Sequence, residues 1–261
     1  MSLVKQSAGF LKYKLKAKTK FDIHSPFIYG LITKVINDKT KHPCYSPVEK
    51  LRAKLLHDER IINVADLGAG SHLNKNTRRK VKDICRTAEK NKKYGQLLYR
   101  LVKHFQPNTV IDLGTSLGIT TLYLSRGNPS GKILTIEGCP ETLAIAKENF
   151  SKCEAGNIQA TEGDFDNALP ALLRTNPKVD FVFIDGNHRK IPTLNYFNLL
   201  LKHSLNESVF VFDDINWSDE MQEAWKEIKK HPSVTVTIDL FFMGIIFFRK
   251  ELSKEEFVIR F

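Results

Sequence analysis

Two glycines and two acidic residues stand at positions where they could bind a nucleoside. A short apolar run ends at Asp112 and leads into a loop that contains Gly114 and Gly118. Glycine lets the backbone approach a ligand closely and turn sharply into a helix. The next apolar run ends at Glu137, and a carboxylate at that place can accept hydrogen bonds from both hydroxyls of a ribose. The pattern therefore predicts a ligand that contains a ribose.

A nicotinamide dinucleotide is the first alternative for such a loop. Its G-x-G-x-x-G fingerprint would need glycines where this chain has Ser116 and Ile119. The carboxylate of Asp112 would also repel a pyrophosphate, whereas it suits a ligand that carries an ammonium and a sulfonium group. The residues therefore favour a cationic nucleoside over a dinucleotide.

Three further carboxylates follow two later apolar runs, which are typical of neighbouring parallel strands. Asp185 follows the first of these runs, and Asp213 and Asp214 follow the second. Three carboxylates in one place repel one another unless they are protonated or bound to a cation. They therefore predict a hard divalent ion, Mg²⁺, Mn²⁺ or Ca²⁺, with oxygen ligands. The alternative is that Asp213 or Asp214 caps the turn or helix that follows.

These motifs together resemble those of the class I S-adenosylmethionine-dependent methyltransferases. The resemblance is carried by D-L-G-T-S-L-G-I-T-T from Asp112, T-I-E ending at Glu137, E-G-D-F ending at Phe165 and F-V-F-I-D-G from Phe181. Within that superfamily the chain is most similar to the catechol and caffeoyl-CoA O-methyltransferases. The likeness includes K-Y-G-Q-L-L from Lys93 and a terminal antiparallel hairpin, and it covers about residues 87–250.

The resemblance implies a binding residue for each part of S-adenosylmethionine. The loop around Gly114 would hold the methionine part, and Glu137 would hold the ribose. Asp164 and Phe165 would contact the edge and the face of the adenine. The whole predicted cofactor-binding set is Asp112, Gly114, Thr115, Ser116, Gly118, Glu137, Gly138, Asp164, Phe165 and Asp185.

The resemblance also implies an acceptor site at the later acidic residues. In the resembled branch an aspartate and a following Asp-Asn pair hold a metal ion, and here Asp214 replaces the asparagine. That branch places a general base, usually lysine, three residues after the first aspartate, where this chain has His188. Histidine can accept a proton at neutral pH, so His188 and Asp185 are the predicted catalytic residues. The implied reaction is methylation of a hydroxyl group on a small molecule, with or without a divalent ion.

The elements that position these residues alternate between strands and helices from about residue 87 onward. Apolar runs predict seven strands, at 109–112, 132–137, 158–161, 179–184, 208–212, 234–240 and 244–249. Helices separate the first six, and the last two strands form an antiparallel hairpin. This order is typical of an α/β, Rossmann-like, doubly wound sheet. Residues 1–86 are predicted to be a mainly helical extension, and residues 87–261 the methyltransferase domain.

A second glycine-rich segment, A-D-L-G-A-G-S at residues 65–71, also follows a short apolar run. No apolar helix face follows this segment, and no strand that ends in an acid comes at the expected distance. We interpret Asp66 to Gly70 as a turn, with a lid over the cofactor as the alternative.

Composition limits the possible partners and compartments. Of the 261 residues, 42% are hydrophobic, enough for a sizeable core, and no stretch is long and apolar enough to span a bilayer. The four cysteines are scattered without metal-type spacing, and the sequence shows no export signal. These features predict reduced thiols in the cytoplasm.

The net charge of +11 is concentrated in two segments, residues 1–20 and residues 75–93. The first holds six lysines and no acid, and Phe10 and Tyr13 lie among the lysines. Such segments are either solvated helix faces or contacts for nucleic acid or an anionic membrane. We expect the apolar residues of the first segment, which include Leu11 and Leu15, to pack on the catalytic domain or on a second subunit of a homodimer. The alternative functions are methylation of tRNA or another nucleic acid, and cofactor binding without turnover.

Overall fold

The computed structural model describes residues 3–65 and 77–261 of the chain. It divides into two compact units, one made of Met1–Asp38 and Pro177–Phe261 and the other of Lys39–Asn176. The first 38 residues thus belong with the C-terminal part of the chain. The predicted extension, residues 1–86, is therefore shared between the two units. The glycine-rich segment from Asp66 to Gly70 lies outside the described residues.

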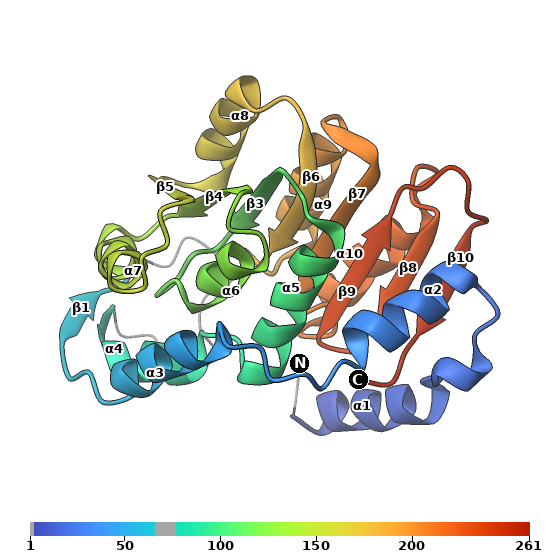
Figure 1. Cartoon of the computed structure of the whole chain (residues 1–261), viewed down its shortest axis with the longest axis horizontal. Helices are drawn as coiled ribbons and strands as arrows, with labels where there is room; N and C mark the ends of the chain where they lie inside the picture. Colours follow the sequence, from blue (N-terminus) through green and yellow to red (C-terminus); the bar gives the residue numbers. More distant parts are fainter. Residues whose placement is uncertain (1–2, 66–76) are drawn as a thin grey trace. The chain divides into compact units, whose positions relative to one another are not determined.

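The unit Lys39–Asn176 is built around three parallel strands (Figure 1). The strands are β3 (Thr109–Leu113), β4 (Lys132–Glu137) and β5 (Ile158–Glu162), in that order across the sheet. Its helices are α3 (Tyr45–Leu55), α4 (Val81–Thr87), α5 (Lys92–Phe105), α6 (Ile119–Gly127), α7 (Pro140–Lys152) and α8 (Phe165–Thr175). A separate antiparallel pair joins β1 (Ile61–Asn63) to β2 (Arg78–Lys80).

Helix α5 shows how the sequence fixes the packing of this unit. The side chain of Asn91 accepts hydrogen bonds from the first turn of the helix, and Gln106 ends the helix in a left-handed conformation. A Cβ atom at Gly95 would lie 2.6 Å from ring carbons of Tyr123 on α6. Only glycine therefore lets α5 and α6 approach this closely.

The other unit contains five strands in the order β10-β8-β9-β7-β6. They are β6 (Val179–Ile184), β7 (Ser204–Asp213), β8 (Val236–Asp239), β9 (Met243–Phe247) and β10 (Glu255–Val258). Strands β6 and β7 are parallel, and β9 is antiparallel to both β7 and β8, which confirms the predicted hairpin. Strand β10, parallel to β8, is an addition to the seven predicted strands.

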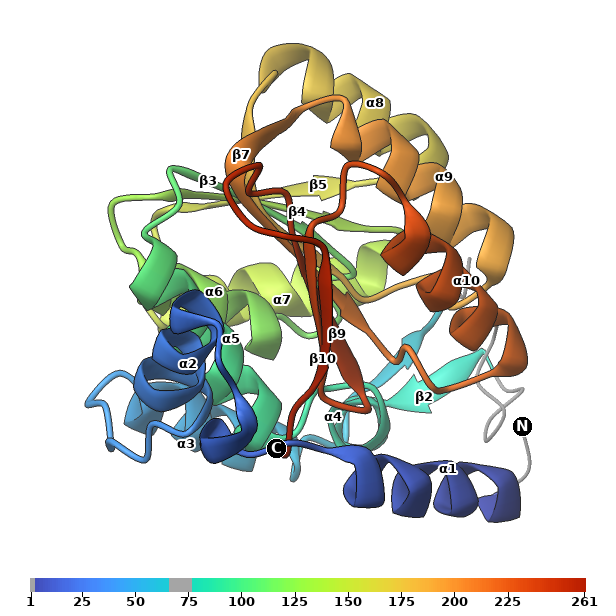
Figure 2. The ribbon, with the colours of Figure 1, turned by 90° about the vertical axis from the view of Figure 1, so that its right-hand side faces the viewer.

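Helices cover both faces of these five strands (Figure 2). They are α1 (Leu3–Lys16), η1 (Lys20–Asp22), α2 (Pro26–Leu31), η2 (Ile32–Ile36), α9 (Lys190–Leu201) and α10 (Asp219–Lys230). On one face, Trp225 of α10 packs over Gly244, where any Cβ would lie 2.6 Å from the indole ring. On the other face, Phe27 of α2 meets Phe247 with ring centroids 5.0 Å apart. The side chain of Ser218 caps α10 and accepts a hydrogen bond from the backbone N–H of Met221.

The predicted α/β class is confirmed, with strands that are mostly parallel and helices between them. Strand β6 buries five of its six residues and β7 buries the last six of its ten, which include the predicted apolar run. In the described part of the chain, no helix has both the length and the apolar character needed to cross a bilayer.

Candidate active site

The loop after β3 has a backbone that only certain residues adopt easily. Gly114 and Gly118 have positive φ angles of 108° and 85°, and Ser116 between them has a φ of 49°. A Cβ atom at Gly118 would lie 2.5 Å from the ring of Phe150. The loop therefore turns directly into the first turn of α6, as the two glycines predict.

Glu137 at the end of β4 is hydrogen-bonded to this loop. One of its carboxylate oxygens accepts the backbone N–H of Ser116 at 2.8 Å, and the other accepts the N–H of Cys139 at 2.9 Å. Each carboxylate oxygen has two lone pairs, so the group can accept further hydrogen bonds from hydroxyls. The predicted ribose-binding acid thus lies against the predicted methionine-binding loop.

Asp112 has a different environment from the one its sequence position suggests. It is completely buried, and one carboxylate oxygen accepts hydrogen bonds from Thr121 at 2.6 Å and Thr135 at 2.8 Å. Burial raises the pKa of Asp112 to about 7, although these two hydroxyls oppose that shift. The carboxyl group therefore connects β3 to β4 and α6, and its direct contact with a ligand stays a prediction. Thr115 joins the same buried cluster, with its hydroxyl 2.6 Å from that of Thr135.

Glu89 is a residue of this region that the sequence reasoning missed. Its carboxylate, fully buried just before α5, accepts the backbone N–H of Leu117 at 2.7 Å. Burial raises the pKa of this carboxyl group, and the hydrogen bond from Leu117 opposes the shift. In the sequence Glu89 stands among the lysines and arginines of the basic segment 75–93, which resembles solvated surface. Its place directly ahead of the K-Y-G-Q motif is the signal that could have identified it.

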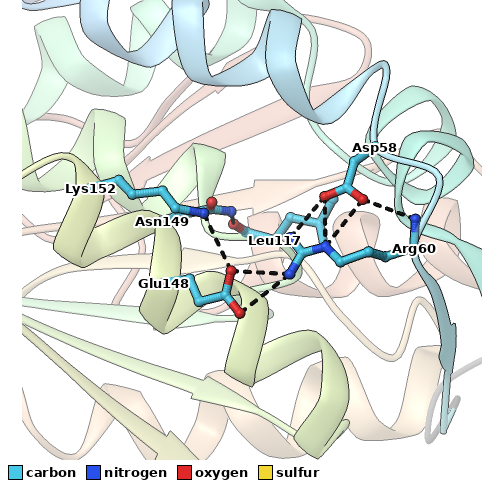
Figure 3. A network of polar contacts seen from close by, with 6 residues as sticks. All are labelled: Asp58, Arg60, Leu117, Glu148, Asn149 and Lys152. Carbon is cyan, nitrogen blue, oxygen red and sulfur yellow. Dashed lines mark hydrogen bonds and ion pairs between the residues drawn. The ribbon is translucent and has the colours of Figure 1, made fainter.

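The carbonyl group of Leu117 is also bonded. Asn149 of α7 donates a hydrogen bond to it at 2.9 Å, so both backbone groups of this loop residue are satisfied within one unit (Figure 3). Figure 3 also shows Arg60 between the carboxylates of Asp58 and Glu148 on the surface beside α7. These partly exposed ion pairs each contribute at most about 1 kcal/mol. The buried hydrogen bonds, rather than these pairs, hold the loop.

The residues predicted to bind adenine lie where β5 is followed by α8. Asp164 is the N-cap of α8 and accepts the backbone N–H of Asn167 at 2.9 Å, and Phe165 is the first residue of the helix. Hydrogen bonds from the side chain and backbone of Asn167 lower the pKa of Asp164. Asp164 therefore has a structural role as a cap in addition to its predicted one.

The predicted catalytic residues lie in the other unit, at the ends of β6 and β7. The Nε2 atom of His188 is 3.6 Å from an oxygen of Asp185 and 4.0 Å from an oxygen of Asp214. Asp214 has a left-handed backbone, with a φ of 53°, and Asp213 before it is almost completely buried. The structure thus brings Asp185, His188 and Asp214 together around the histidine.

The metal ion predicted from the sequence stays a prediction. In residues 3–65 and 77–261, no group of three or more His, Cys, Asp and Glu side chains is arranged to hold a metal ion. Asp213 is buried at the end of β7, and His188 lies within 4.0 Å of both Asp185 and Asp214.

Comparison with known proteins places this geometry in a family context. Residues 111–215 match a protein family described as a methyltransferase domain. Over 124 residues the chain is 28% identical to the catechol O-methyltransferase of Niastella koreensis. The aligned region covers 46% of this chain and 55% of that protein. Over 117 residues it is 32% identical to the transmembrane O-methyltransferase of Homo sapiens, covering 42% of this chain and 39% of that protein. The chain thus spans between two fifths and just over half of the length of these relatives.

Solved structures share the fold. The O-methyltransferase from Bacillus cereus in complex with SAH superposes with a TM-score of 0.55 at 17% identity, covering 83% of this chain and 94% of that chain. The O-methyltransferase TomG from Streptomyces achromogenes, in complex with SAM, gives a TM-score of 0.57 at 18% identity. The superposition covers 85% of this chain and 94% of that chain. Residues 111–215 therefore match a methyltransferase domain, and the resemblance of this chain to the class I S-adenosylmethionine-dependent O-methyltransferases is confirmed.

Proposed function

We propose that this protein transfers the methyl group of S-adenosylmethionine to a hydroxyl oxygen of a small-molecule acceptor. The observation that carries the proposal is the hydrogen bond between Glu137 and the backbone of Ser116, which joins the two predicted halves of a cofactor site. The methyltransferase-domain match and the O-methyltransferases among the relatives support it.

The residues of the unit Lys39–Asn176 fit the cofactor. The left-handed backbone at Gly114 and Gly118 turns the loop into α6, and Glu137 beside this loop has lone pairs for the ribose hydroxyls. Gly138 follows Glu137 directly, and Asp164 and Phe165 would complete the adenine end. S-adenosylmethionine supplies a methyl group that its sulfonium already activates. The protein therefore has to bind and align the reactants rather than activate the donor.

The acceptor side would depend on His188. We propose that its imidazole accepts the proton of the acceptor hydroxyl, and that Asp185 and Asp214 orient the ring and stabilise its charged form. We assign no step to Mg²⁺, Mn²⁺ or Ca²⁺, whose site stays a prediction.

Binding of the reaction product S-adenosylhomocysteine tests the cofactor assignment. We expect calorimetric titration to show binding, and the melting temperature to rise with the concentration of the product. Glu137→Ala should weaken this binding, whereas Glu255→Ala, an exposed acid on β10, should leave it unchanged. Absence of heat and of a thermal shift, together with tight binding of NADH, would contradict the methyltransferase proposal.

A panel of hydroxylated small molecules and a tRNA substrate tests the acceptor class. Methyl transfer to a small hydroxylated molecule would support the proposal. Transfer only to the nucleic acid would contradict the small-molecule part. Cofactor binding without transfer to any substrate would favour a binding module.

A further inference from the structure

Helix α1 is attached to the rest of its unit by one face only. The hydroxyl of Tyr13 donates a hydrogen bond to the carbonyl oxygen of Ile259 at 2.5 Å, and its ring lies 5.5 Å from that of Phe241. Ala17, four residues later, is buried in the same cluster. Figure 2 shows α1 beside the C-terminal end of the chain. This face accounts for the attachment of the helix, and it leaves the opposite face to solvent.

The opposite face is apolar although it is exposed. Leu11 and Leu15 are four residues apart and so lie on one side of the helix, with 64% and 81% of their surfaces exposed. Phe21, just after the helix, is 83% exposed. Three of the nine exposed large hydrophobic residues in the described chain, Leu11, Leu15 and Phe21, are thus on this helix or just after it. Such a concentration marks an interaction surface rather than scattered exposed residues.

Lysines border this apolar stripe on both sides. Lys12 and Lys16 lie on one side of the leucines, and no described residue forms an ion pair with either of them. On the other side, the amine of Lys14 lies 5.2 Å from the centre of the Phe10 ring. Helix α1 contains no acidic residue. An apolar stripe between lysines is the pattern of a helix that lies in the interface of an anionic membrane.

We propose that this surface of α1, made of Leu11, Lys12, Leu15 and Lys16, docks on an anionic lipid bilayer. The leucines would enter the boundary of the acyl chains, and the lysine amines would reach the lipid phosphates. The helix has 14 residues, too few to span the hydrocarbon core, so it would lie in the plane of the membrane. This proposal is independent of the proposed methyl transfer.

Two other occupants fit the surface less well. Nucleic acid would use aromatic side chains to stack on bases, but the most exposed part of the helix is aliphatic, at Leu15. A second copy of the chain would bring the two lysine borders together, and like charges repel. An anionic bilayer would bury the apolar stripe and attract the lysines on its borders.

Co-sedimentation of the full chain with vesicles tests the proposal. We expect binding to vesicles of phosphatidylcholine mixed with phosphatidylglycerol, little binding to phosphatidylcholine alone, and release by salt. Lys12→Gln combined with Lys16→Gln should lower the partition coefficient about 25-fold, because each lysine contributes about five-fold. Leu11→Ser combined with Leu15→Ser should lower it by about 100-fold.

Matched changes elsewhere serve as controls. Lys226→Gln with Lys230→Gln alters an exposed lysine pair of the same spacing on α10, and Ile61→Ser removes an exposed apolar residue from β1. Both should bind vesicles like the parent protein. Circular dichroism and S-adenosylhomocysteine binding of every variant show whether it is folded, and they report on the cofactor site separately.

Three results would overturn the proposal. The first is absence of binding to the anionic vesicles, or equal binding to both kinds. The second is that the protein shifts the mobility of RNA only when Lys12 and Lys16 are present, and does not bind vesicles. The third is a dimer in solution that dissociates when Leu11 and Leu15 are changed, again without vesicle binding, which would make the surface an interface between two copies.

Discussion

The carboxylate of Glu89 accepts the backbone N–H of Leu117 at 2.7 Å, so a side chain from the segment before α5 fixes the loop that follows β3. Both groups are buried, and an unsatisfied buried N–H costs about 1–3 kcal/mol. The acid therefore acts on the predicted cofactor site through the backbone of the loop.

We expect Glu89→Ala to weaken S-adenosylhomocysteine binding about ten-fold, because the loop loses one of its two anchors at Leu117. The affinity of Glu89→Gln for S-adenosylhomocysteine should stay within about three-fold of the parent's, since the glutamine amide oxygen can accept the same hydrogen bond. Calorimetric titration measures both, with Glu59→Ala, a change to an exposed acid of the same unit, as the control. Equal losses in the two Glu89 variants would show that the hydrogen bond is not what matters.

Gly118→Ala should reduce the free energy of unfolding by at least about 2 kcal/mol, because alanine there is strained at a φ of 85° and meets the Phe150 ring. Gly156→Ala is the matched control, since a Cβ atom at that position would have no neighbour within 4 Å. The free energy of unfolding of Gly156→Ala should exceed that of the parent by no more than about 1 kcal/mol. Urea denaturation followed by fluorescence compares the two. Similar values for both variants would contradict the strain at Gly118.

The stability of the protein should depend on pH through Asp112. Burial raises the pKa of this carboxyl group to about 7 from an ordinary value of 3.8, so the folded state holds a proton that the unfolded state releases. The resulting stabilisation is complete below pH 3.8 and is lost as the pH rises toward 7. The free energy of unfolding should therefore fall by about 2 kcal/mol between about pH 5 and pH 7, relative to Asp112→Asn. A constant difference between the two proteins across this range would refute the raised pKa.

Methyl transfer should survive chelation. With excess EDTA, activity on a hydroxylated acceptor should stay within about two-fold of the activity without EDTA. His188→Ala should lower kcat about 100-fold and leave the affinity for S-adenosylhomocysteine unchanged. His203→Ala is the control and should keep its activity, since this half-buried histidine is bonded to the Pro177 carbonyl. Loss of activity in EDTA that Mg²⁺ restores would instead support the metal ion predicted from the sequence.

Much of the fold could be predicted from the sequence because its strands are continuous apolar runs. Strands β6 and β7 and the β8–β9 hairpin were recognisable in this way. Strand β10 was missed because Phe257 is its only buried residue, which is too little for a pattern.

Helix α1 shows a limit of another kind. It carries two apolar stripes, one with Tyr13 and one with Leu11 and Leu15, and the sequence alone does not say which one packs. Packing on the rest of the chain or on a second subunit was predicted for both. Tyr13 packs within the chain, whereas the leucines are exposed in it, so their packing on a second subunit stays a prediction. The partner of Tyr13, Ile259, lies 246 residues away, so no local pattern could reveal the choice.

The candidate site was predictable to the extent that each residue follows a strand or a glycine turn. Glu137 and the loop from Gly114 to Gly118 were found because the end of a parallel strand is where ligands bind. Glu89 was missed because its role depends on burial, and the neighbouring lysines made its segment resemble solvated surface. The grouping around His188 depends on side-chain geometry that spacing does not determine.

The contact between Tyr13 and Ile259 also sets an order of events during synthesis. The ribosome makes α1 long before the residues that cover its buried face, at a rate of roughly 5–20 residues per second. Helix α1 therefore waits roughly 10–50 s for Ile259 to be synthesised. During that interval both of its apolar stripes are exposed on the nascent chain, and a cell must keep them from aggregating.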